Sequence, residues 1–562
     1  MLLKEKNKKQ TVLQLTALFL VMAFAIVIAA CPGDDVGGKQ QGEQEIAEIP
    51  KNYVSGEDAL TWGIEAAPVT LGLTPGNDTT EIKLNWYSNG ITNPVAKVRF
   101  VKGTFAQGTK LIDPELDNYS SIVDSAVSDA SSGNKAHKVT VKGLEPGSSY
   151  QYAVSSDGAN WSEAYDFKIP AKTGAFKFAV IADPQLTTGN VDTNSRYLQG
   201  STTAAGWLET MSIIVQKGVS FIASGGDQVD KSAGDEAEYN NFFAPDGLRN
   251  LPFAPVSGNH DNHLHFNYHY NLPNAQTFED ETVPTAAGRN YFYIYNNILF
   301  VVLNTAPYPT ASGEKDVTTA KLHTNRFDKT IAAAIAKFPK TGDSNGNNKW
   351  DWLIVQHHKS TASVANHIAD KDIQAYVEAG FETIMSKYNV DFVITGHDHV
   401  YARSWPLEGK DNGKVSVPVK TGGTNDNHEF NNPGKPIYLT FTTASGLKYY
   451  QVSSDKTFPY NDNPVNNTEY PYLGNVTDQS GTSSTAVGTA AYKGPPAMLP
   501  VSNLAFVQPW IPSYCIVEVD GKTIKFSTYA IATVAGNHTE GTTEAFSFNK
   551  DEPYDWVRVT KN

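Results

Sequence analysis

Residues 392–403 have the sequence Phe-Val-Ile-Thr-Gly-His-Asp-His-Val-Tyr-Ala-Arg. A short apolar run ends at Ile394, and His397, Asp398 and His399 follow almost at once. An uninterrupted apolar run of this kind suits a strand that is buried on both faces between helices. In layered α/β folds, ligand sites gather beyond the carboxyl ends of such strands. The segment therefore predicts a buried strand that delivers potential metal ligands to a site.

The same pattern extends upstream through the chain. Further apolar runs cover residues 176–182, 219–223, 298–303 and 352–355. Polar clusters of metal-ligand type close this series of strands: Asp183-Pro184-Gln185, Gly226-Asp227-Gln228-Val229-Asp230, Gly258-Asn259-His260-Asp261, His357-His358 and Gly396-His397-Asp398-His399. Each cluster alone is typical of an ordinary turn, but five in succession predict one metal centre. Carboxylate, imidazole and amide ligands together favour first-row transition metals over calcium or a thiolate zinc site.

The surrounding pattern predicts a layered domain over residues 174–550. Val377, Phe381, Ile384, Met385 and Tyr388 recur at the spacing of one apolar helix face. A later β region contains a hairpin turn at Asp520-Gly521. We expect a four-layer α/β/β/α arrangement, with two sheets between helices.

Residues 65–170 have a different character, because apolar and polar residues alternate. Ile82, Leu84 and Trp86 fall on one face of an expected strand. The string from Leu144 to Tyr150, Leu-Glu-Pro-Gly-Ser-Ser-Tyr, resembles the tyrosine corner of fibronectin type III-like sandwiches. We expect an N-terminal β-sandwich with a structural role, since the region contains no cluster of catalytic type.

The first 31 residues resemble a bacterial lipoprotein signal peptide. Four lysines precede an apolar run over residues 15–30, and Ile28-Ala29-Ala30-Cys31 resembles a lipobox. We expect an exported protein that is attached to the cell envelope through lipidated Cys31, facing the periplasm or the cell surface. An uncleaved membrane anchor is the alternative, although the apolar run is short for a span. Residues 32–64 have the composition of a flexible tether.

The net charge of the 562-residue chain also limits its partners. A formal charge of −14 repels polyanions, which argues against a nucleic-acid scaffold role. Small phosphorylated substrates remain compatible with this charge, because metal ions can reverse the sign of the local field.

The series of strand-end clusters resembles the calcineurin-like metallophosphoesterase superfamily. Residues 396–403, together with the preceding sandwich, resemble the purple acid phosphatase branch and its bacterial relatives. The resemblance implies two metal ions. Asp183 and His399 would bind the first, Asn259, His358 and His397 would bind the second, and Asp227 would bridge both. A hydroxide at the metals would then attack phosphorus in line.

The resemblance also implies roles for three residues near the metals. His260 would face the substrate and stabilise charge in the transition state, and Asp261 would orient His260. In purple acid phosphatases the fourth motif places its ligand six residues after a tryptophan, and a further histidine nine residues later. Trp352, His358 and His367 match this spacing. His358 is therefore preferred to His357 as the ligand, and His367 is expected to contact the substrate.

Two positions depart from the purple acid phosphatase pattern. Asp230 occupies the position of the iron-binding tyrosine, and Gln185 occupies the position of a glycine. Gln185 would bind a metal through its amide oxygen or hydrogen-bond a metal-bound water. Without a phenolate, manganese, zinc or ferrous iron are all plausible, and we expect no purple colour.

The sequence therefore predicts an exported phosphomonoesterase of the acid phosphatase type. A phosphodiesterase or nucleotide hydrolase on the same centre is the alternative within the enzyme class. A surface binding protein that retains the fold is the non-catalytic alternative, but the presence of Asp227 and His260 favours an enzyme. Tyr449, Tyr450 and the polar stretch over residues 453–494 are expected to form a rim or lid.

Overall fold

The computed structural model describes residues 69–103, 123–450, 474–477, 483–486 and 503–562, apart from gaps at 194, 196, 199, 232–233, 282–286, 308–309, 312–313, 345–347, 409–416, 419–427 and 538–544. The expected signal peptide (residues 1–31), Cys31, the tether (residues 32–64) and most of residues 453–494 lie outside the described residues. Among the helices of the described residues, none has the length and apolar character that a membrane span requires.

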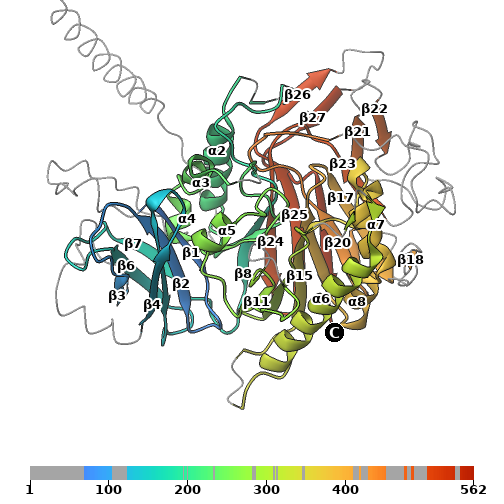
Figure 1. Ribbon diagram of the computed structural model, residues 1–562. Coiled ribbons are helices and arrows are strands. Elements are labelled where there is room, and N and C mark those ends of the chain that lie inside the picture. Colours follow the sequence, from blue (N-terminus) through green and yellow to red (C-terminus); the bar gives the residue numbers. More distant parts are fainter. Residues whose placement is uncertain are drawn as a thin grey trace, which may run out of the picture. The chain divides into compact units, whose positions relative to one another are not determined.

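The N-terminal domain consists of two antiparallel sheets (Figure 1). The first sheet contains β1 (Val69–Pro75), β2 (Ile82–Ser88), β5 (Lys135–Val141) and β4 (Val123–Asp129), in that order, with the short η2 (Ser131–Gly133) before β5; the second contains β3 (Lys97–Lys102), β6 (Ser149–Ser155) and β7 (Tyr165–Lys168). Leu84, Trp86 and Tyr152 are buried in a common core. The Tyr150 hydroxyl accepts a hydrogen bond of 2.8 Å from the backbone N–H of Glu145, which is the bond that a tyrosine corner makes.

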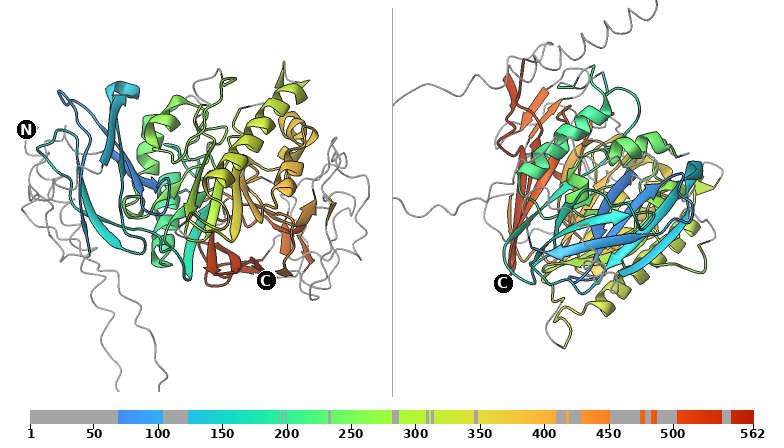
Figure 2. Two further views of the ribbon diagram at one scale, coloured as in Figure 1. Left: turned by 90° about the horizontal axis from the view of Figure 1, so that it is seen from below. Right: turned by 90° about the vertical axis from the view of Figure 1, so that its left-hand side faces the viewer.

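The second domain contains two larger sheets that pack face to face. The first runs β10 (Phe253–Ala254), β9 (Ile222–Ser224), β8 (Phe176–Ile181), β24 (Ser513–Asp520), β25 (Thr523–Ala530), β28 (Asp555–Thr560) and β19 (Glu429–Asn431). The second runs β11 (Tyr291–Tyr295), β12 (Ile298–Val302), β15 (Trp352–Lys359), β16 (Phe392–Gly396), β20 (Ile437–Thr440), β17 (Tyr401–Glu408) and β18 (Val417–Pro418), and β23 (Asn503–Val507) also pairs with β17. Figure 2 shows both sheets from two further directions.

Helices cover the outer faces of the two sheets. α2 (Thr203–Gln216), α3 (Glu236–Phe242), α4 (Gly247–Asn250) and α5 (Leu264–His269) follow strands of the first sheet, and α6 (Val317–Lys337), α7 (Lys371–Glu378) and α8 (Phe381–Lys387) follow strands of the second. Minor elements are η3 (Asn366–Ala369) and the pairs β13 (Thr310–Ala311) with β14 (Glu314–Lys315), β21 (Gly474–Thr477) with β22 (Ser483–Ala486), and β26 (Val534–Asn537) with β27 (Ala545–Phe548).

Successive side chains of β12 point to opposite faces of the sheet, and both faces are covered, which explains its continuous apolar sequence. Phe300 and its even-numbered neighbours pack in the core between the sheets, against Phe178 of β8. Leu299 and Val301 belong to a second core, which contains Phe327 of α6. Both faces of the strand are therefore buried, as its sequence predicts, and the expected α/β/β/α order is confirmed.

One expected helix is interrupted. The apolar face predicted from Val377 to Tyr388 belongs to two helices, α7 and α8, which are separated at Gly380. Gly380 has φ +83°, a left-handed conformation that ends a helix and that glycine adopts without steric cost. Phe381 and Met385 of α8 nevertheless pack in the same core as Ala375 and Tyr376 of α7, and Val377 is also buried. The expected hairpin turn at Asp520-Gly521 joins β24 to β25.

Candidate metal centre

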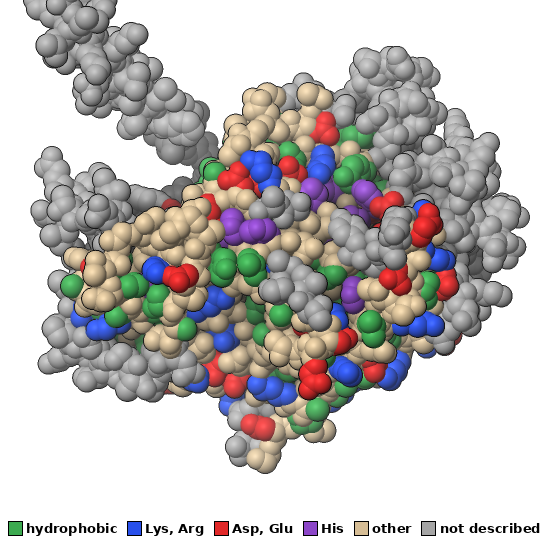
Figure 3. Space-filling model, viewed as in Figure 1, with side chains coloured by type: hydrophobic (Ala, Val, Ile, Leu, Met, Phe, Trp, Pro, Cys, Tyr) green, Lys and Arg blue, Asp and Glu red, His purple; other side chains and the backbone are tan. Residues whose placement is uncertain are grey.

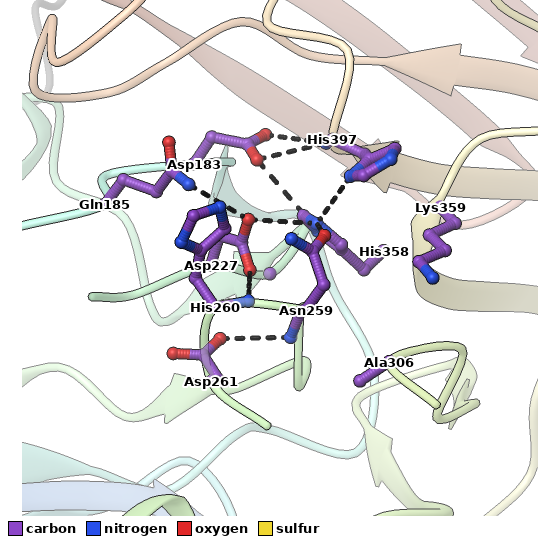
Figure 4. A network of polar contacts seen from close by, with 12 residues as sticks. Asp183, Gln185, Asp227, Asn259, His260, Asp261, Ala306, His358, Lys359 and His397 are labelled. Atoms are coloured by element: carbon purple, nitrogen blue, oxygen red, sulfur yellow. Dashed lines mark hydrogen bonds and ion pairs between the residues drawn. The ribbon is translucent and has the colours of Figure 1, made fainter. Parts of the chain in front are cut away.

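The polar strand-end clusters meet at one edge of the two sheets. β8, β9 and β10 are parallel neighbours in the first sheet, and β15, β16 and β20 are parallel neighbours in the second. Parallel strands present their carboxyl ends at the same edge, so residues far apart in the sequence come together there. The residues brought together are Asp183, Gln185, Asp227, Asn259, His260, Asp261, His358 and His397 (Figure 4).

Asp227 lies at the middle of this group. Its Oδ2 is 3.1 Å from His358 Nε2 and accepts a hydrogen bond of 3.2 Å from Gln185 Nε2. Its Oδ1 accepts a hydrogen bond of 2.9 Å from the backbone N–H of His260. Oδ2 therefore lies between candidate ligands from two other motifs, as a bridging carboxylate requires, and the His260 N–H fixes the carboxylate through Oδ1.

Two further ligand sets flank Asp227, as expected for two metals. On one side, Asp183 Oδ1 lies 3.5 Å from His399 Nε2. On the other side, His358 Nε2 lies 3.0 Å from Asn259 Oδ1 and 3.2 Å from His397 Nδ1. The ligand atoms of Asp227, His358 and His397 all lie within 4.8 Å of one another.

The structure separates the two adjacent histidines of β15. His358 points into the centre, and its Nδ1 is 2.8 Å from the Gly225 carbonyl oxygen. A hydrogen bond at Nδ1 fixes the imidazole so that Nε2 can bind a metal. The His357 ring instead packs edge-on against Phe381 of α8, with 4.8 Å between ring centroids. This geometry favours His358 as the ligand.

The backbone of the centre is strained at most of its expected ligands. Positive φ angles occur at Asp183 (45°), Gln185 (38°), Asp227 (51°), His397 (73°) and His399 (48°). Residues other than glycine rarely adopt this conformation, and such residues concentrate at functional sites.

The glycines of the motifs are required by close approach. A Cβ atom on Gly258 would lie 1.9 Å from Asp227 Oδ1, and one on Gly396 would lie 2.3 Å from Asp183 Oδ2. A Cβ atom on Gly226 would lie 2.4 Å from His358 Nδ1. Each motif glycine therefore makes room for a ligand that another strand supplies.

The buried carboxylates of Asp183 and Asp227 lie close together and compete for the positive charge of the same histidine, His358. Burial raises the pKa of Asp183 well above its usual range; His358 opposes this effect and Asp227 adds to it. Burial also opposes ionisation of Asp227, but His358 and His260 hold its pKa below the usual range. Burial alone would lower the pKa of His358, yet Asp227 and Asp183 raise it to about 9. A bound cation would relieve this competition.

The remaining ligand types also fit a transition metal. Burial lowers the pKa of His399 to about 3 and that of His397 well below its ordinary value, so both imidazoles are neutral and have a lone pair. Gln185 Oε1 is buried and accepts no hydrogen bond from the described residues. An uncompensated buried oxygen beside carboxylates and neutral imidazoles suits a cation. The residues present therefore fit the metals that the sequence implies.

Asp261 has a different role from the one expected. Its carboxylate accepts hydrogen bonds from the backbone N–H groups of Gly258 (3.0 Å) and Gln228 (3.1 Å), and so connects the loops after β9 and β10. His260 is oriented by Asp230 instead: its Nδ1 contacts the Asp230 carbonyl oxygen and lies 3.6 Å from Asp230 Oδ1. Adjacent residues in this turn point in different directions, so the sequence order did not reveal the partner.

His367 lies at the edge of the centre. Its ring centroid is 4.5 Å from that of His397 and 4.8 Å from that of Tyr450. Burial lowers the pKa of His367, but the hydrogen bond of 2.6 Å from Nδ1 to Asp370 Oδ2 and the charges of Asp398, Asp370 and Asp372 together raise it above its ordinary value. Protonated His367 can therefore donate to a substrate oxygen.

Several supporting residues were not predicted. The Lys448 carbonyl oxygen is 2.7 Å from His399 Nδ1, and Gln508 Nε2 donates to the His399 carbonyl oxygen at 2.8 Å. Arg289 is fully buried and donates to the carbonyl oxygens of Asp261 and His263, which holds the segment around His260. Most of these contacts involve the main chain, and a main-chain contact leaves no residue-specific signal in the sequence.

The histidines that follow the third motif serve mainly in packing. His269 is stacked between Tyr87 and Tyr239, at 4.2 and 4.1 Å between ring centroids, and its Nε2 is 2.9 Å from Glu236 Oε2. His265 Nδ1 lies 3.4 Å from Glu236 Oε1. Histidine side chains also reach the surface across the middle of the face shown in Figure 3.

Comparisons with known proteins agree with the geometry. The family model for calcineurin-like phosphoesterases matches residues 176–401, and that for the N-terminal domain of purple acid phosphatases matches residues 68–169. Among solved structures, the purple acid phosphatase PPD1 from yellow lupin (Lupinus luteus) seeds is similar with a TM-score of 0.53 and 14% identity, over 88% of this chain and 75% of that chain. PhoD gives a TM-score of 0.46 and 12% identity, over 88% of this chain and 92% of that chain. No curated protein matches the sequence.

Proposed function

We propose that this chain, which contains a calcineurin-like phosphoesterase domain behind a purple acid phosphatase N-terminal domain, hydrolyses phosphomonoesters at a dinuclear metal centre. The observation that carries the proposal is the position of Asp227 Oδ2, which lies 3.1 Å from His358 Nε2 and 3.2 Å from Gln185 Nε2, between candidate ligands from two other motifs. When two metal ions are bound, they lower the pKa of a water molecule and neutralise charge on the phosphoryl oxygens.

The chain's own residues complete the site. His260 is about one quarter exposed, and the Asp230 carbonyl oxygen holds its Nδ1 so that Nε2 is left for the substrate. His367, with its Nδ1 on Asp370, donates a hydrogen bond or proton from its position beside His397. Both side chains are partly exposed, as substrate contacts require. Such donors contribute most when charge develops on the phosphoryl or leaving-group oxygen.

The experiment is a comparison of turnover on p-nitrophenyl phosphate and bis-p-nitrophenyl phosphate, with and without chelator. We expect faster turnover of the monoester, loss with chelator, and recovery when manganese, zinc or ferrous iron is restored. Faster turnover of the diester would instead support the phosphodiesterase alternative. Absence of turnover on both esters by the metal-loaded protein would contradict the proposal and favour a binding protein.

We also propose that the protein is exported and held at the cell envelope through lipidated Cys31. The basic start, the apolar run over residues 15–30 and the lipobox-like residues 28–31 support this proposal. Labelling with a radioactive fatty acid in a bacterial host tests it. Wild-type protein should incorporate label and sediment with membranes, whereas Cys31→Ser should do neither. Equal labelling of both proteins would contradict it.

A further inference from the structure

A short loop after β20, Gly446–Tyr450, borders the metal centre, and we call it the rim loop. A backbone group of each of its residues makes a hydrogen bond. The N–H groups of Gly446, Leu447 and Tyr449 donate to Thr443 Oγ1 (3.1 Å), Ser445 Oγ (3.3 Å) and Asp192 Oδ2 (3.2 Å), respectively. The Lys448 carbonyl oxygen contacts His399 Nδ1 (2.7 Å), and the Tyr450 carbonyl oxygen accepts from Gln508. The loop is therefore preorganised, and its side chains start from defined positions.

The Lys448 side chain extends from this loop toward the substrate side of the centre. Its Nζ lies 3.6 Å from Asp230 Oδ1, and the same oxygen lies 3.6 Å from His260 Nδ1. His260 in turn donates its backbone N–H to Asp227. The Lys448 ammonium is thus separated from the expected bridging ligand by only two residues. The side chains of Lys448, Asp230 and His260 are 29%, 31% and 25% exposed, so all three remain open to solvent.

The pair of Lys448 and Asp230 is suited to exchange. A partly exposed ion pair at this distance contributes little to stability. The Asp230 backbone is fixed independently, because its N–H donates to Glu238 Oε2 and to the Leu186 carbonyl oxygen, both at 3.1 Å. Lys448 can therefore leave Asp230 for another anion by side-chain rotation alone. An ammonium is a flexible point charge with three donors, which suits a phosphate group.

We propose that Lys448 forms a subsite for a second anionic group of the substrate, so that bisphosphorylated compounds are preferred to simple phosphomonoesters. The proposal rests on the function proposed above, with the scissile phosphoryl group at the metals beside His260. The second phosphate replaces Asp230 as the partner of the ammonium. The exchange breaks the ion pair between Lys448 and Asp230, which lies next to His260.

The test compares adenosine 3′,5′-bisphosphate with the two adenosine monophosphates, 3′ and 5′, by phosphate release from the metal-loaded full chain. In Lys448→Met, the KM for the bisphosphate should rise about tenfold more than the KM for either monophosphate, the size expected for one charge-assisted hydrogen bond. In Lys448→Arg, the KM for the bisphosphate should stay close to the wild-type value, because the positive charge is kept. Lys177→Met is the matched control, because Lys177 is half exposed and pairs with Glu518 on β24 at 3.5 Å instead.

A second variant moves the result in the opposite direction. Asp230→Asn removes the competing carboxylate charge while keeping the backbone contact to His260, so the KM for the bisphosphate should fall relative to that for the monophosphates. If the ion pair is only structural, both variants raise the KM for all three substrates by the same factor, and the subsite is excluded. If wild-type protein hydrolyses none of them, the proposed function fails. Calorimetric binding of the bisphosphate to wild type and Lys448→Met then still tests the subsite by itself.

Discussion

His137 in the N-terminal sandwich and His358 in the metal centre are both fully buried, but their surroundings shift their pKa values in opposite directions. Burial lowers the pKa of His137 to about 4; its ring stacks on Trp86 and its Nε2 meets Ser88 Oγ at 2.6 Å. Burial would do the same to His358, but Asp227 and Asp183 raise its pKa to about 9. The sandwich therefore buries a neutral ring, whereas the metal centre is arranged to hold positive charge.

The backbone shows the same contrast. Most of the expected ligands in the second domain have left-handed φ angles, such as 51° at Asp227 and 73° at His397, and Asn259 and His358 do not. His137 lies inside the regular strand β5, paired with Trp86 of β2. Strain persists only where surrounding contacts enforce it, and here the enforced conformation aims ligands at one point. The sandwich also contains positive φ angles, at Thr70, Asn93 and Ser132, but these residues are not candidate ligands, whereas strain in the second domain coincides with the expected metal centre.

The largest expected effect comes from removing the shared carboxylate. Asp227→Ala should lower kcat/KM by on the order of 10³-fold and release bound metal, because both ligand sets lose a member. Asp129→Ala on the exposed surface of the sandwich is the control and should change neither. Metal analysis and p-nitrophenyl phosphate turnover check both variants. Full activity of Asp227→Ala would contradict the bridging role.

The adjacent histidines of β15 give the next effect. His358→Gln should lower metal affinity by about 10- to 100-fold or more, since it removes an imidazole that faces Asn259 and His397. His357→Gln changes a buried ring against Phe381 and should mainly lower Tm. Metal titration and thermal melts distinguish the two. A reversed result would make His357 the ligand.

A smaller effect is expected from the motif glycine. Gly258→Ala places a Cβ against Asp227 Oδ1, so the carboxylate must move and metal affinity should fall by about tenfold. Gly189→Ala is the matched control, because its new Cβ would meet its nearest neighbour at 3.7 Å, an ordinary contact. Metal titration of both variants checks this. Equal affinity in the two would mean that the close approach at Gly258 is unimportant.

The smallest effect concerns the sandwich and pH. The folded pKa of His137, about 4, is below the ordinary value of 6.5, so the unfolded chain binds more protons between these values. Stability from keeping the ring neutral is present above pH 6.5 and is lost as pH falls toward 4. Wild type should lose about 2 kcal/mol more than His137→Gln between pH 7 and pH 5. Chemical denaturation at both pH values measures the free energy of unfolding of the two proteins. An equal loss in wild type and His137→Gln would contradict the prediction.

The sequence predicted which residues gather at the sheet edge because strand periodicity and motif glycines are local signals. A run such as residues 352–355 specifies a buried strand, and the polar residues after it must then lie at the sheet edge. The same periodicity could not choose between His357 and His358, since adjacent residues on a strand point to opposite faces. Only the position of the second core behind α8 settles the direction of His357.

Other parts could not be predicted, for physical reasons. The role of Asp261 depended on which backbone N–H groups lie within reach of its carboxylate, and these belong to two different loops. The break between α7 and α8 required a left-handed Gly380, and the apolar spacing around it is also compatible with one continuous helix. Lys448 and Gln508 reach His399 from distant segments, so only the fold brings them together.

The strand-end residues are expected to form a dinuclear metal centre. Elemental mass spectrometry of the purified full chain, after incubation with manganese, zinc or ferrous iron and removal of free metal, tests this most directly. We predict about two equivalents of transition metal per chain, falling in Asp227→Ala. Absence of bound transition metal in the folded wild-type protein would contradict the account.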